Sequence, residues 1–387
     1  MVKIGLIAEN AKELEDFFMI LNNLNLTFPI KVYIIYLADI YKDKNQDELF
    51  DKINFEYKIF KVKNPYNKSF RKYSLIEKIK LVKQNIKSMF DFIEKCRIFL
   101  CGTQVVFQRV LYCKIKKNKL PMKIISYHRH LLFSNPINEK YSKILHNKIT
   151  YKLLSMLNLD GLLIKIKLVG FADKYLVLGE INKFYLTHNG IDENDIIPVG
   201  SLELDEKIVL NNNLERLSPK ICYITTAFEH HGQLDNEKYQ KQKIENLLYH
   251  CQKQNLTDIT IRIHPRENFE KYELLKTRYD FLNLQYPSNN KLLHDLKEFD
   301  VLIGGVSTVL FEVMNRKKVI FYILEQEKKL YQNLIDNFSL PYITELSNLK
   351  QQIYKYKITD KSQFIKYDPN EKAIDRIVNM LKNELKC

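Results

Sequence analysis

The residue types in this chain that are best suited to chemistry form two small groups. The first group follows the alternating apolar run 258–263 and consists of His264, Pro265 and Arg266. Arginine carries a permanent positive charge that suits phosphate oxygens, and histidine titrates near neutral pH. Proline removes a backbone donor and fixes the turn just beyond the run. The group indicates a site for a phosphate-bearing ligand, although a lone histidine at such a place is more often a structural residue.

The second group follows the apolar run 300–303, about forty residues downstream, and consists of Gly304, Gly305, Ser307 and Thr308. Glycine lets the backbone approach a ligand closely and permits a tight turn. The two hydroxyls are predicted to cap the helix 309–314, whose first N–H groups attract anions. Glu312 lies one helical turn beyond Thr308, within reach of a sugar hydroxyl. The alternative interpretation is an ordinary glycine turn before a capped helix.

Both groups lie at the ends of predicted strands. Residues 258–314 have the pattern strand, helix, strand, helix, strand, helix, with the middle strand at 281–286. In doubly wound α/β sheets, ligands bind at the carboxyl ends of the strands. The two groups are therefore predicted to lie on the ligand-binding edge of one sheet.

The first half of the chain shows the same alternation. Strands are predicted at 2–8, 30–37, 55–62, 97–100 and 122–127, with helices at 11–24 and 74–95 between them. This order predicts a parallel sheet covered by helices on both faces. The turn after the first strand lacks the glycine pattern of a dinucleotide-binding fold. Further on, a helix is predicted at 138–158 and a linker at 211–216.

Three further residues are candidate general bases because they titrate and follow predicted strands: His128, His130 and Glu229. Packed structural histidines are the alternative for the first two. Glu229 precedes two adjacent histidines, which suggest a metal site, but no third ligand stands at a useful spacing. The sequence therefore predicts no bound metal and no other cofactor.

The two groups resemble a known signature. His264–Pro265 with Ser307–Thr308 is similar to the HP and S-[ST] motifs of bacterial GT-B glycosyltransferases that use CMP-activated sugars, the sialyl-, polysialyl- and Kdo-transferases. The run 307–312 is also similar to a motif of CDP-glycerol glycerophosphotransferases. The close resemblance covers about fifty-five residues. The chain departs from these families after its fifth strand, where it has neither an Asp-Gly-type nor a Gln-His-Gly motif, so the identity of the base stays open.

The resemblance implies an α/β protein of the GT-B type, with two Rossmann-like domains facing each other across a cleft. Residues 1–210 would bind the acceptor, residues 211–370 the donor, and a helix in 371–387 would cross back to the first domain. The implied activity is inverting, metal-independent transfer of a sialic, nonulosonic or Kdo-type sugar from a CMP-sugar to a capsule or lipooligosaccharide acceptor. A CDP-glycerol or polyol phosphotransferase and a UDP-hexose glycosyltransferase are the enzymatic alternatives.

Composition limits the partners. The net charge is +15 over 387 residues, which favours acidic partners such as nucleotides or an anionic lipid surface, although an AT-rich genome would also enrich lysine. A basic nucleic-acid-binding α/β protein is the non-enzymatic alternative. The lysines are dispersed and no aromatic RNA-binding motif is present, so nucleic acid is not the expected partner.

Localisation follows from what the sequence lacks. It contains no signal-peptide pattern, no apolar run of about eighteen residues and no CxxC pair among its six cysteines. We expect a cytoplasmic protein with reduced thiols. The lysine-rich stretch 78–87 is predicted to bring it to the inner face of the membrane.

Overall fold

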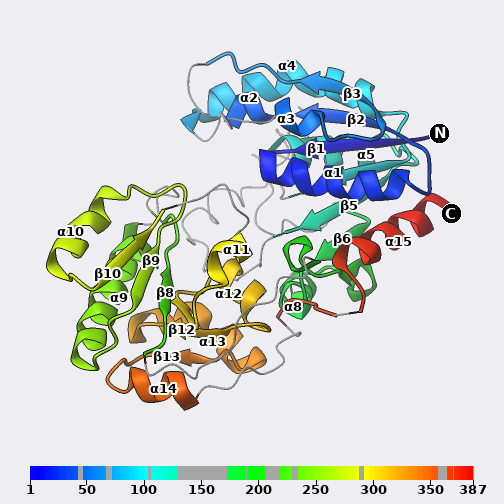
Figure 1. Cartoon of the computed structure of the whole chain (residues 1–387). Helices are drawn as coiled ribbons and strands as arrows, with labels where there is room; N and C mark the ends of the chain where they lie inside the picture. The colour runs from blue at the N-terminus through cyan, green and yellow to red at the C-terminus, as the bar shows by residue number, and fades with distance from the viewer. Residues whose placement is uncertain are drawn as a thin grey trace. The chain divides into compact units, whose positions relative to one another are not determined.

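The computed structural model describes residues 1–41, 47–66, 72–102, 106–129, 172–188, 190–205, 218–228, 234–286, 292–355, 364–368 and 370–386. The chain divides into two compact units, one of Met1–Asp205 with Lys366–Cys387 and one of Glu206–Ile365. Each unit contains one parallel β-sheet with helices packed on it (Figure 1). The predicted α/β fold with two parallel sheets is confirmed.

Unit 1 is built on a sheet with the strand order β3-β2-β1-β4-β5-β6-β7. Its strands are β1 (Val2–Ala8), β2 (Ile30–Tyr36), β3 (Glu56–Lys61), β4 (Ile98–Cys101), β5 (Lys123–His128), β6 (Lys174–Val177) and β7 (Ile196–Pro198). All neighbouring strands pair in parallel. The inner strands are apolar almost throughout because both faces of the sheet are covered. The strand order reverses direction between β1 and β4, which makes that place the switch point of the sheet.

Two hydrophobic clusters cover the two faces of this sheet. One contains α1 (Ala11–Asn25) and the C-terminal helix α15 (Ala373–Lys386), which lie side by side in Figure 1. The other contains α4 (Leu75–Ile93) and α5 (Val106–Lys117). The other helices of this unit among the described residues are α2 (Ala38–Tyr41), α3 (Asp47–Phe50), α8 (Glu180–His188), η3 (Glu193–Asp195) and η4 (Leu202–Asp205).

The start of α15 is attached to unit 1 by polar contacts. The carboxylate of Asp205 accepts the backbone N–H groups of Ala373 and Ile374 at 2.6 and 2.8 Å. Arg376 donates from Nε to the carbonyl of Val199 at 2.8 Å. The two bonds to Asp205 satisfy free N–H donors at the first turn of the helix, and all three bonds fix the start of α15 on unit 1.

Unit 2 is built on a sheet with the strand order β10-β9-β8-β11-β12-β13, again parallel throughout. Its strands are β8 (Ile221–Ile224), β9 (Ile259–Arg262), β10 (Leu282–Gln285), β11 (Val301–Gly304), β12 (Lys318–Tyr322) and β13 (Tyr342–Ile343). Its helices are α9 (Leu234–Lys253), α10 (Glu270–Arg278), α11 (Leu292–Leu296), α12 (Thr308–Val313), η5 (Glu325–Glu327), α13 (Lys328–Phe338) and α14 (Leu349–Lys355). The switch point lies between β8 and β11.

The sequence predicted most of these elements, but not all. The short strand β13 and the helix α14 were not predicted, because their residues lie in a lysine-rich stretch without clear periodicity. The predicted helix 138–158 and the linker 211–216 lie outside the described residues. Among the helices that the structure describes, none is both long enough and apolar enough to cross a membrane.

Candidate functional site

The sheet of unit 2 brings the two polar groups to one edge. β9 and β11 are the two neighbours of β8, so His264 and Gly305 follow strands that flank β8. Parallel strands lie about 4.8 Å apart, which places the two turns about 10 Å from each other. Thr225, just after β8, lies between them. The edge therefore has two candidate contact points on either side of the end of β8.

The turn after β9 is fixed by its own backbone. Glu267 donates its N–H to the carbonyl of His264 at 2.9 Å, which closes a tight turn over Pro265 and Arg266. The N–H of His264 donates to the hydroxyl of Thr225 at 2.8 Å, which ties the turn to β8. Pro265 and Arg266 are exposed, while His264 is half-buried. The permanent cation of Arg266 is therefore accessible to an anion.

Hydrogen bonding also decides the tautomer of His264. The backbone N–H of Arg266 donates to Nδ1 of the ring at 3.1 Å. A ring nitrogen that accepts a hydrogen bond carries no proton, so the neutral ring holds its proton on Nε2. His264 is consequently a hydrogen-bond donor at Nε2, the form suited to a phosphate oxygen.

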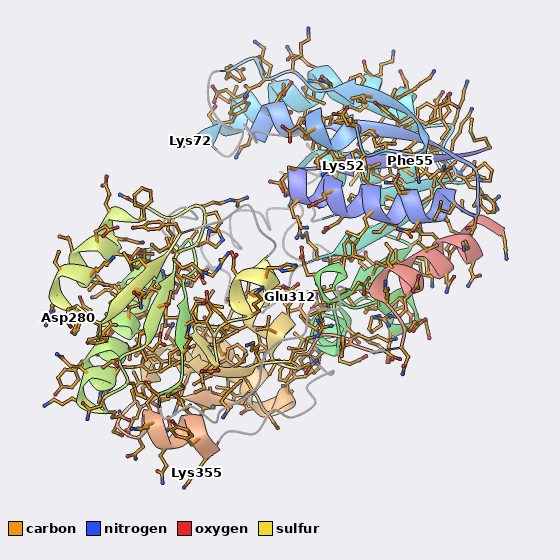
Figure 2. All side chains as sticks on the ribbon, viewed as in Figure 1. Lys52, Phe55, Lys72, Asp280, Glu312 and Lys355 are labelled. Atoms are coloured by element: carbon orange, nitrogen blue, oxygen red, sulfur yellow. The ribbon has the colours of Figure 1, made fainter. Side chains whose placement is uncertain are left out.

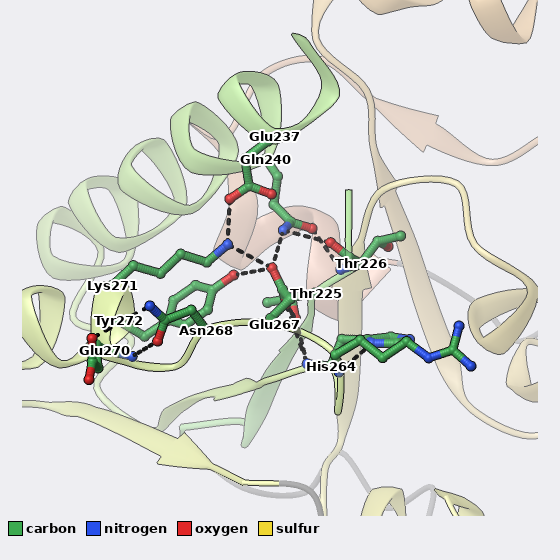
Figure 3. A network of polar contacts seen from close by, with 11 residues as sticks. Thr225, Thr226, Glu237, Gln240, His264, Glu267, Asn268, Glu270, Lys271 and Tyr272 are labelled. Carbon is green, nitrogen blue, oxygen red and sulfur yellow. Dashed lines mark hydrogen bonds and ion pairs between the residues drawn. The ribbon is translucent and has the colours of Figure 1, made fainter. Parts of the chain in front are cut away.

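Beneath this turn lies a polar network centred on the carboxylate of Glu267, shown in Figure 3. It accepts hydrogen bonds from Thr225, Gln240, Lys271 and Tyr272. The side chain of Glu267 is 0% exposed, so this carboxylate is held entirely by protein groups. Sequence analysis did not identify Glu267, although it stands next to Arg266.

Close packing explains the two glycines at the end of β11, of which Gly304 is the last strand residue and Gly305 the next. Among the described residues, Gly190 and Gly200 are the glycines with positive φ, so Gly304 and Gly305 do not depend on a left-handed backbone. A Cβ atom on Gly304 would lie 3.0 Å from the carbonyl oxygen of Ile224. A Cβ atom on Gly305 would lie 3.2 Å from Nζ of Lys243. Close packing against β8 and α9 thus explains both glycines without a ligand.

Lys243 is itself unusual. Its side chain is buried and forms an ion pair with the buried Glu327 at 2.9 Å. Burial lowers the pKa of Lys243, and the neighbouring carboxylate of Glu327 opposes this shift. The ammonium group of Lys243 thus lies beside Gly305, in the turn that was predicted to bind an anion.

The predicted capping of the next helix is wrong. Ser307 occupies the N-cap position of α12 with an extended backbone, φ −141° and ψ 151°, but its hydroxyl makes no capping hydrogen bond. The Oγ atom is buried and has no hydrogen-bond partner among the described residues. The N–H groups two and three residues further on, which an N-cap side chain normally accepts, are therefore not bonded to this hydroxyl. Ser307 therefore has an unused hydroxyl at the carboxyl edge of the sheet.

Glu312 lies on the same short helix and is labelled in Figure 2. Its side chain is buried within unit 2. Its predicted contact with a sugar hydroxyl stays a prediction.

Unit 1 has a second polar group at its own switch point. Glu13 is buried, and its carboxylate accepts the N–H of Glu9 at 2.6 Å. Its carboxylate occupies the space that a side chain at Gly102 would need. Asn10 caps α1 by accepting the N–H of Glu13 at 2.9 Å. Sequence analysis did not identify Glu13, although an asparagine followed three residues later by glutamate is a recognised helix-start pattern.

His128 ends β5 close to this group and is 5% exposed. Its Nε2 lies 3.0 Å from the hydroxyl of Ser126, which in turn donates to the carbonyl of Gly102 at 3.2 Å. Because the hydroxyl has one proton and gives it to Gly102, it accepts from His128. The neutral ring therefore holds its proton on Nε2 and its lone pair on Nδ1. The other two candidate bases, His130 and Glu229, lie outside the described residues.

In the part of the chain that the structure describes, no group of three or more His, Cys, Asp or Glu side chains is arranged to hold a metal ion. The five described cysteines are buried and unpaired with one another.

No protein-family model and no curated protein sequence matches the chain. Solved structures match it over its whole length. The fold is GT-B. The UDP-GlcNAc 2-epimerase of Methanocaldococcus jannaschii, in complex with UDP-GlcNAc and UDP, is 14% identical with a TM-score of 0.58, covering 99% of this chain and 100% of the other.

Two glycosyltransferase structures match similarly. The lipopolysaccharide outer core galactosyltransferase WaaB in its apo form is 14% identical with a TM-score of 0.53, covering 100% of this chain and 99% of the other. UGT2 of Phytolacca americana, complexed with UDP-2fluoro-glucose and pterostilbene, is 9% identical with a TM-score of 0.54 and full coverage of both chains. Structural similarity at identities this low shows the GT-B fold alone.

Proposed function

We propose that this protein is a glycosyltransferase whose unit 2 binds a pyrimidine nucleotide sugar. The observation that carries the proposal is the geometry of His264. Its ring is a neutral donor at Nε2, held at the carboxyl end of β9 beside the end of β8. A fixed donor of this kind stabilises the charge that develops on a leaving phosphate without reorganising during the reaction.

The surrounding groups complete a phosphate site. Arg266 supplies an exposed cation, and Ser307 supplies a hydroxyl whose Oγ has no partner among the described residues. Arginine and hydroxyl groups are common ligands of phosphate oxygens. With these groups the leaving nucleotide is stabilised by protein side chains, as expected for a metal-independent transferase.

Unit 1 supplies the candidate base. Transfer to a hydroxyl requires removal of its proton, and we propose His128 for that role. Ser126 holds Nε2, so Nδ1 is the basic nitrogen of the neutral ring. His130 and Glu229 stay predictions for the same role.

The nucleotide of the donor is CMP or UDP. The motifs that include His264 and Ser307 resemble those of transferases that use CMP-sugars, and the proposed acceptor is a capsule or lipooligosaccharide glycan. Structures that share the fold contain UDP, UDP-GlcNAc or UDP-2fluoro-glucose. A UDP-hexose donor is therefore supported at least as well as a CMP-linked nonulosonic acid.

A second candidate function is epimerisation of a UDP-sugar. It is supported by whole-length similarity to two UDP-GlcNAc 2-epimerases with TM-scores of 0.58 and 0.55. An epimerase changes its sugar without an acceptor, whereas a transferase releases nucleotide only when an acceptor or water takes the sugar.

Two measurements test the proposal. Calorimetric titration with CMP, CDP, UDP and a polynucleotide should show binding of a pyrimidine nucleotide and no specific binding of the polynucleotide. A donor screen with CMP-nonulosonates, UDP-hexoses and CDP-glycerol, with and without glycan acceptors, should then show acceptor-dependent nucleotide release. Binding of polynucleotide alone would replace the proposal with a nucleic-acid-binding function, and acceptor-free sugar conversion would replace it with epimerisation.

We further propose that the exposed face of α4 contacts an anionic membrane. Lys80, Lys83 and Lys87 are exposed on this helix, and Ile76 near its start is 78% exposed. Each lysine near such a surface contributes about 1 kcal/mol, and salt weakens the attraction. Co-sedimentation with anionic vesicles at low salt should be lost when these lysines are changed to glutamine. Sedimentation that is unaffected by the changes would refute the assignment of this face.

A further inference from the structure

The buried carboxylate of Glu267 accepts several hydrogen bonds near the proposed phosphate site. Its Oε1 accepts hydrogen bonds from Tyr272 at 2.9 Å, from Lys271 at 2.9 Å and from Gln240 at 3.1 Å. Its Oε2 accepts the hydroxyl proton of Thr225 and, at 3.4 Å, the backbone N–H of His264. A carboxylate can accept about four hydrogen bonds, so both oxygens are well occupied in the structure.

The network connects the end of β8 with the turn after β9. The hydroxyl of Thr225 gives its only proton to Glu267, which leaves its lone pairs to accept the N–H of His264 at 2.8 Å. The side-chain amide of Gln240 binds the backbone of Thr226 twice. It accepts the N–H of Thr226 at 2.7 Å and donates to the carbonyl of Thr226 at 3.0 Å. Glu267 thus contacts both Thr225 at the end of β8 and the backbone of His264 in the turn after β9 (Figure 3).

The network requires a negative charge at position 267. All four side-chain partners of Glu267 approach it as donors. Burial alone would lower the pKa of Lys271, but its hydrogen bonds to Glu237 and Glu267 raise it, so its ammonium group is retained. A neutral amide at position 267 would present two N–H donors to these donors, and at least one pair would be left unsatisfied.

We infer that Glu267 is a positioning residue for nucleotide binding, which sets the place and the tautomer of His264 through Thr225 and the turn that it closes. The inference rests on the proposed function, because it concerns the same phosphate site. Glu267 does not touch the ligand in this scheme. It orders the groups that do.

The first test compares Glu267→Gln with Glu270→Gln. Glu270 lies three residues further along, is exposed, and bonds Asn268 rather than the carboxylate of Glu267, so its variant makes the same charge change as a matched control. Loss of a hydrogen bond to a charged group corresponds to about tenfold or more in affinity, and we expect this loss of pyrimidine nucleotide binding for Glu267→Gln alone. Affinity is measured by calorimetry at a temperature where circular dichroism shows both variants folded.

The second test determines which ring nitrogen of His264 carries the proton. Nitrogen-15 NMR of the free protein distinguishes a protonated from an unprotonated ring nitrogen, and His264→Asn assigns the signals. We expect the Nε2–H tautomer in the wild-type protein and in Glu270→Gln, and loss of this single tautomer in Glu267→Gln. A residue that only stabilised the fold would leave the tautomer of the folded protein unchanged.

Thr225→Val covers the case in which Glu267→Gln does not fold. It keeps the shape of the side chain but removes the hydroxyl that joins Glu267 to His264, so it should reproduce the loss of affinity. Normal nucleotide affinity together with a normal His264 tautomer in either folded variant would overturn the inference. If the wild-type protein binds no pyrimidine nucleotide, the proposed function fails, while the NMR comparison still decides whether Glu267 positions His264.

Discussion

The two turns at the carboxyl edge of unit 2 are built differently. The turn after β9 is held by hydrogen bonds, from the N–H of His264 through Thr225 to the buried carboxylate of Glu267. The turn after β11 is shaped by close packing of Gly304 and Gly305, and Ser307 keeps a hydroxyl without a partner in the described residues. The first turn is therefore fully formed before a ligand arrives, whereas the second contains a group that a ligand can satisfy.

This difference separates two ways of making a binding site. Preorganised donors lower the cost of stabilising charge, because they need no rearrangement when the charge appears. A buried hydroxyl without a partner costs about 1–3 kcal/mol in the free protein, and a ligand that accepts its hydrogen bond recovers this cost. Substitutions in the two turns should accordingly differ in how much they change stability and how much they change nucleotide binding.

The largest effect is expected for His264→Ala. Loss of a preorganised donor to the leaving phosphate should lower turnover by about 10²-fold or more. The measurements are turnover per folded molecule and melting temperature. A variant that melts earlier but retains normal turnover would show that His264 is purely structural, and the contrast between the two turns would then lose its functional meaning.

The glycines of the second turn should differ from each other. Gly304→Ala places a Cβ atom 3.0 Å from the backbone oxygen of Ile224, which cannot move easily, so we expect destabilisation of about 1–3 kcal/mol. Gly305→Ala meets the end of the Lys243 side chain at 3.2 Å, and the cost should be smaller. Denaturant unfolding of both variants measures the two costs. Equal costs would contradict the assignment of the turn to packing against β8.

Ser307→Ala should weaken binding without loss of stability. Removing a buried hydroxyl that has no described partner should leave the melting temperature unchanged or raise it, while nucleotide affinity falls by about tenfold. The double variant with Thr308→Ala should bind more weakly still. Unchanged affinity of the double variant would move the phosphate site away from this turn.

The opposite edge of the same sheet provides a control. Lys317, immediately before β12, is buried, and its ammonium group donates to the carbonyls of Lys297 and Phe299. Burial lowers the pKa of Lys317 to about 8, below its usual value of 10.5. Between these two pH values the unfolded chain binds more protons than the folded protein at this site, so the contribution of Lys317 to stability rises as the pH rises through this window.

We therefore expect the free energy of unfolding to increase more steeply between pH 8 and 10 in the wild-type protein than in Lys317→Met, by at most about 1.4 kcal/mol per pH unit. Nucleotide affinity should be the same in both folded proteins, because this residue is at the amino edge of the sheet. Urea unfolding across this pH range checks the slope. Identical slopes would mean that Lys317 does not titrate in this window.

Much of the fold could be predicted because its signals are local. The first strand was predicted at 2–8 and is found as Val2–Ala8, and the strand before the first polar group was predicted at 258–263 and is found as Ile259–Arg262. Apolar runs, helical periodicity and turn residues each extend over a few neighbours in the chain, so sequence alone reveals them. The position of His264 and of Ser307 after strands follows from the same local pattern.

The properties that give these residues their chemistry depend on distant contacts. Glu267 reaches Thr225 across 42 residues of sequence, and Lys243 reaches Glu327 across 84. Only the sheet order β9-β8-β11-β12 brings these partners together. Whether a carboxylate is buried, which nitrogen of His264 carries the proton and whether the hydroxyl of Ser307 has a partner were therefore decided by tertiary structure, because hydrogen bonds and burial depend on proximity in space.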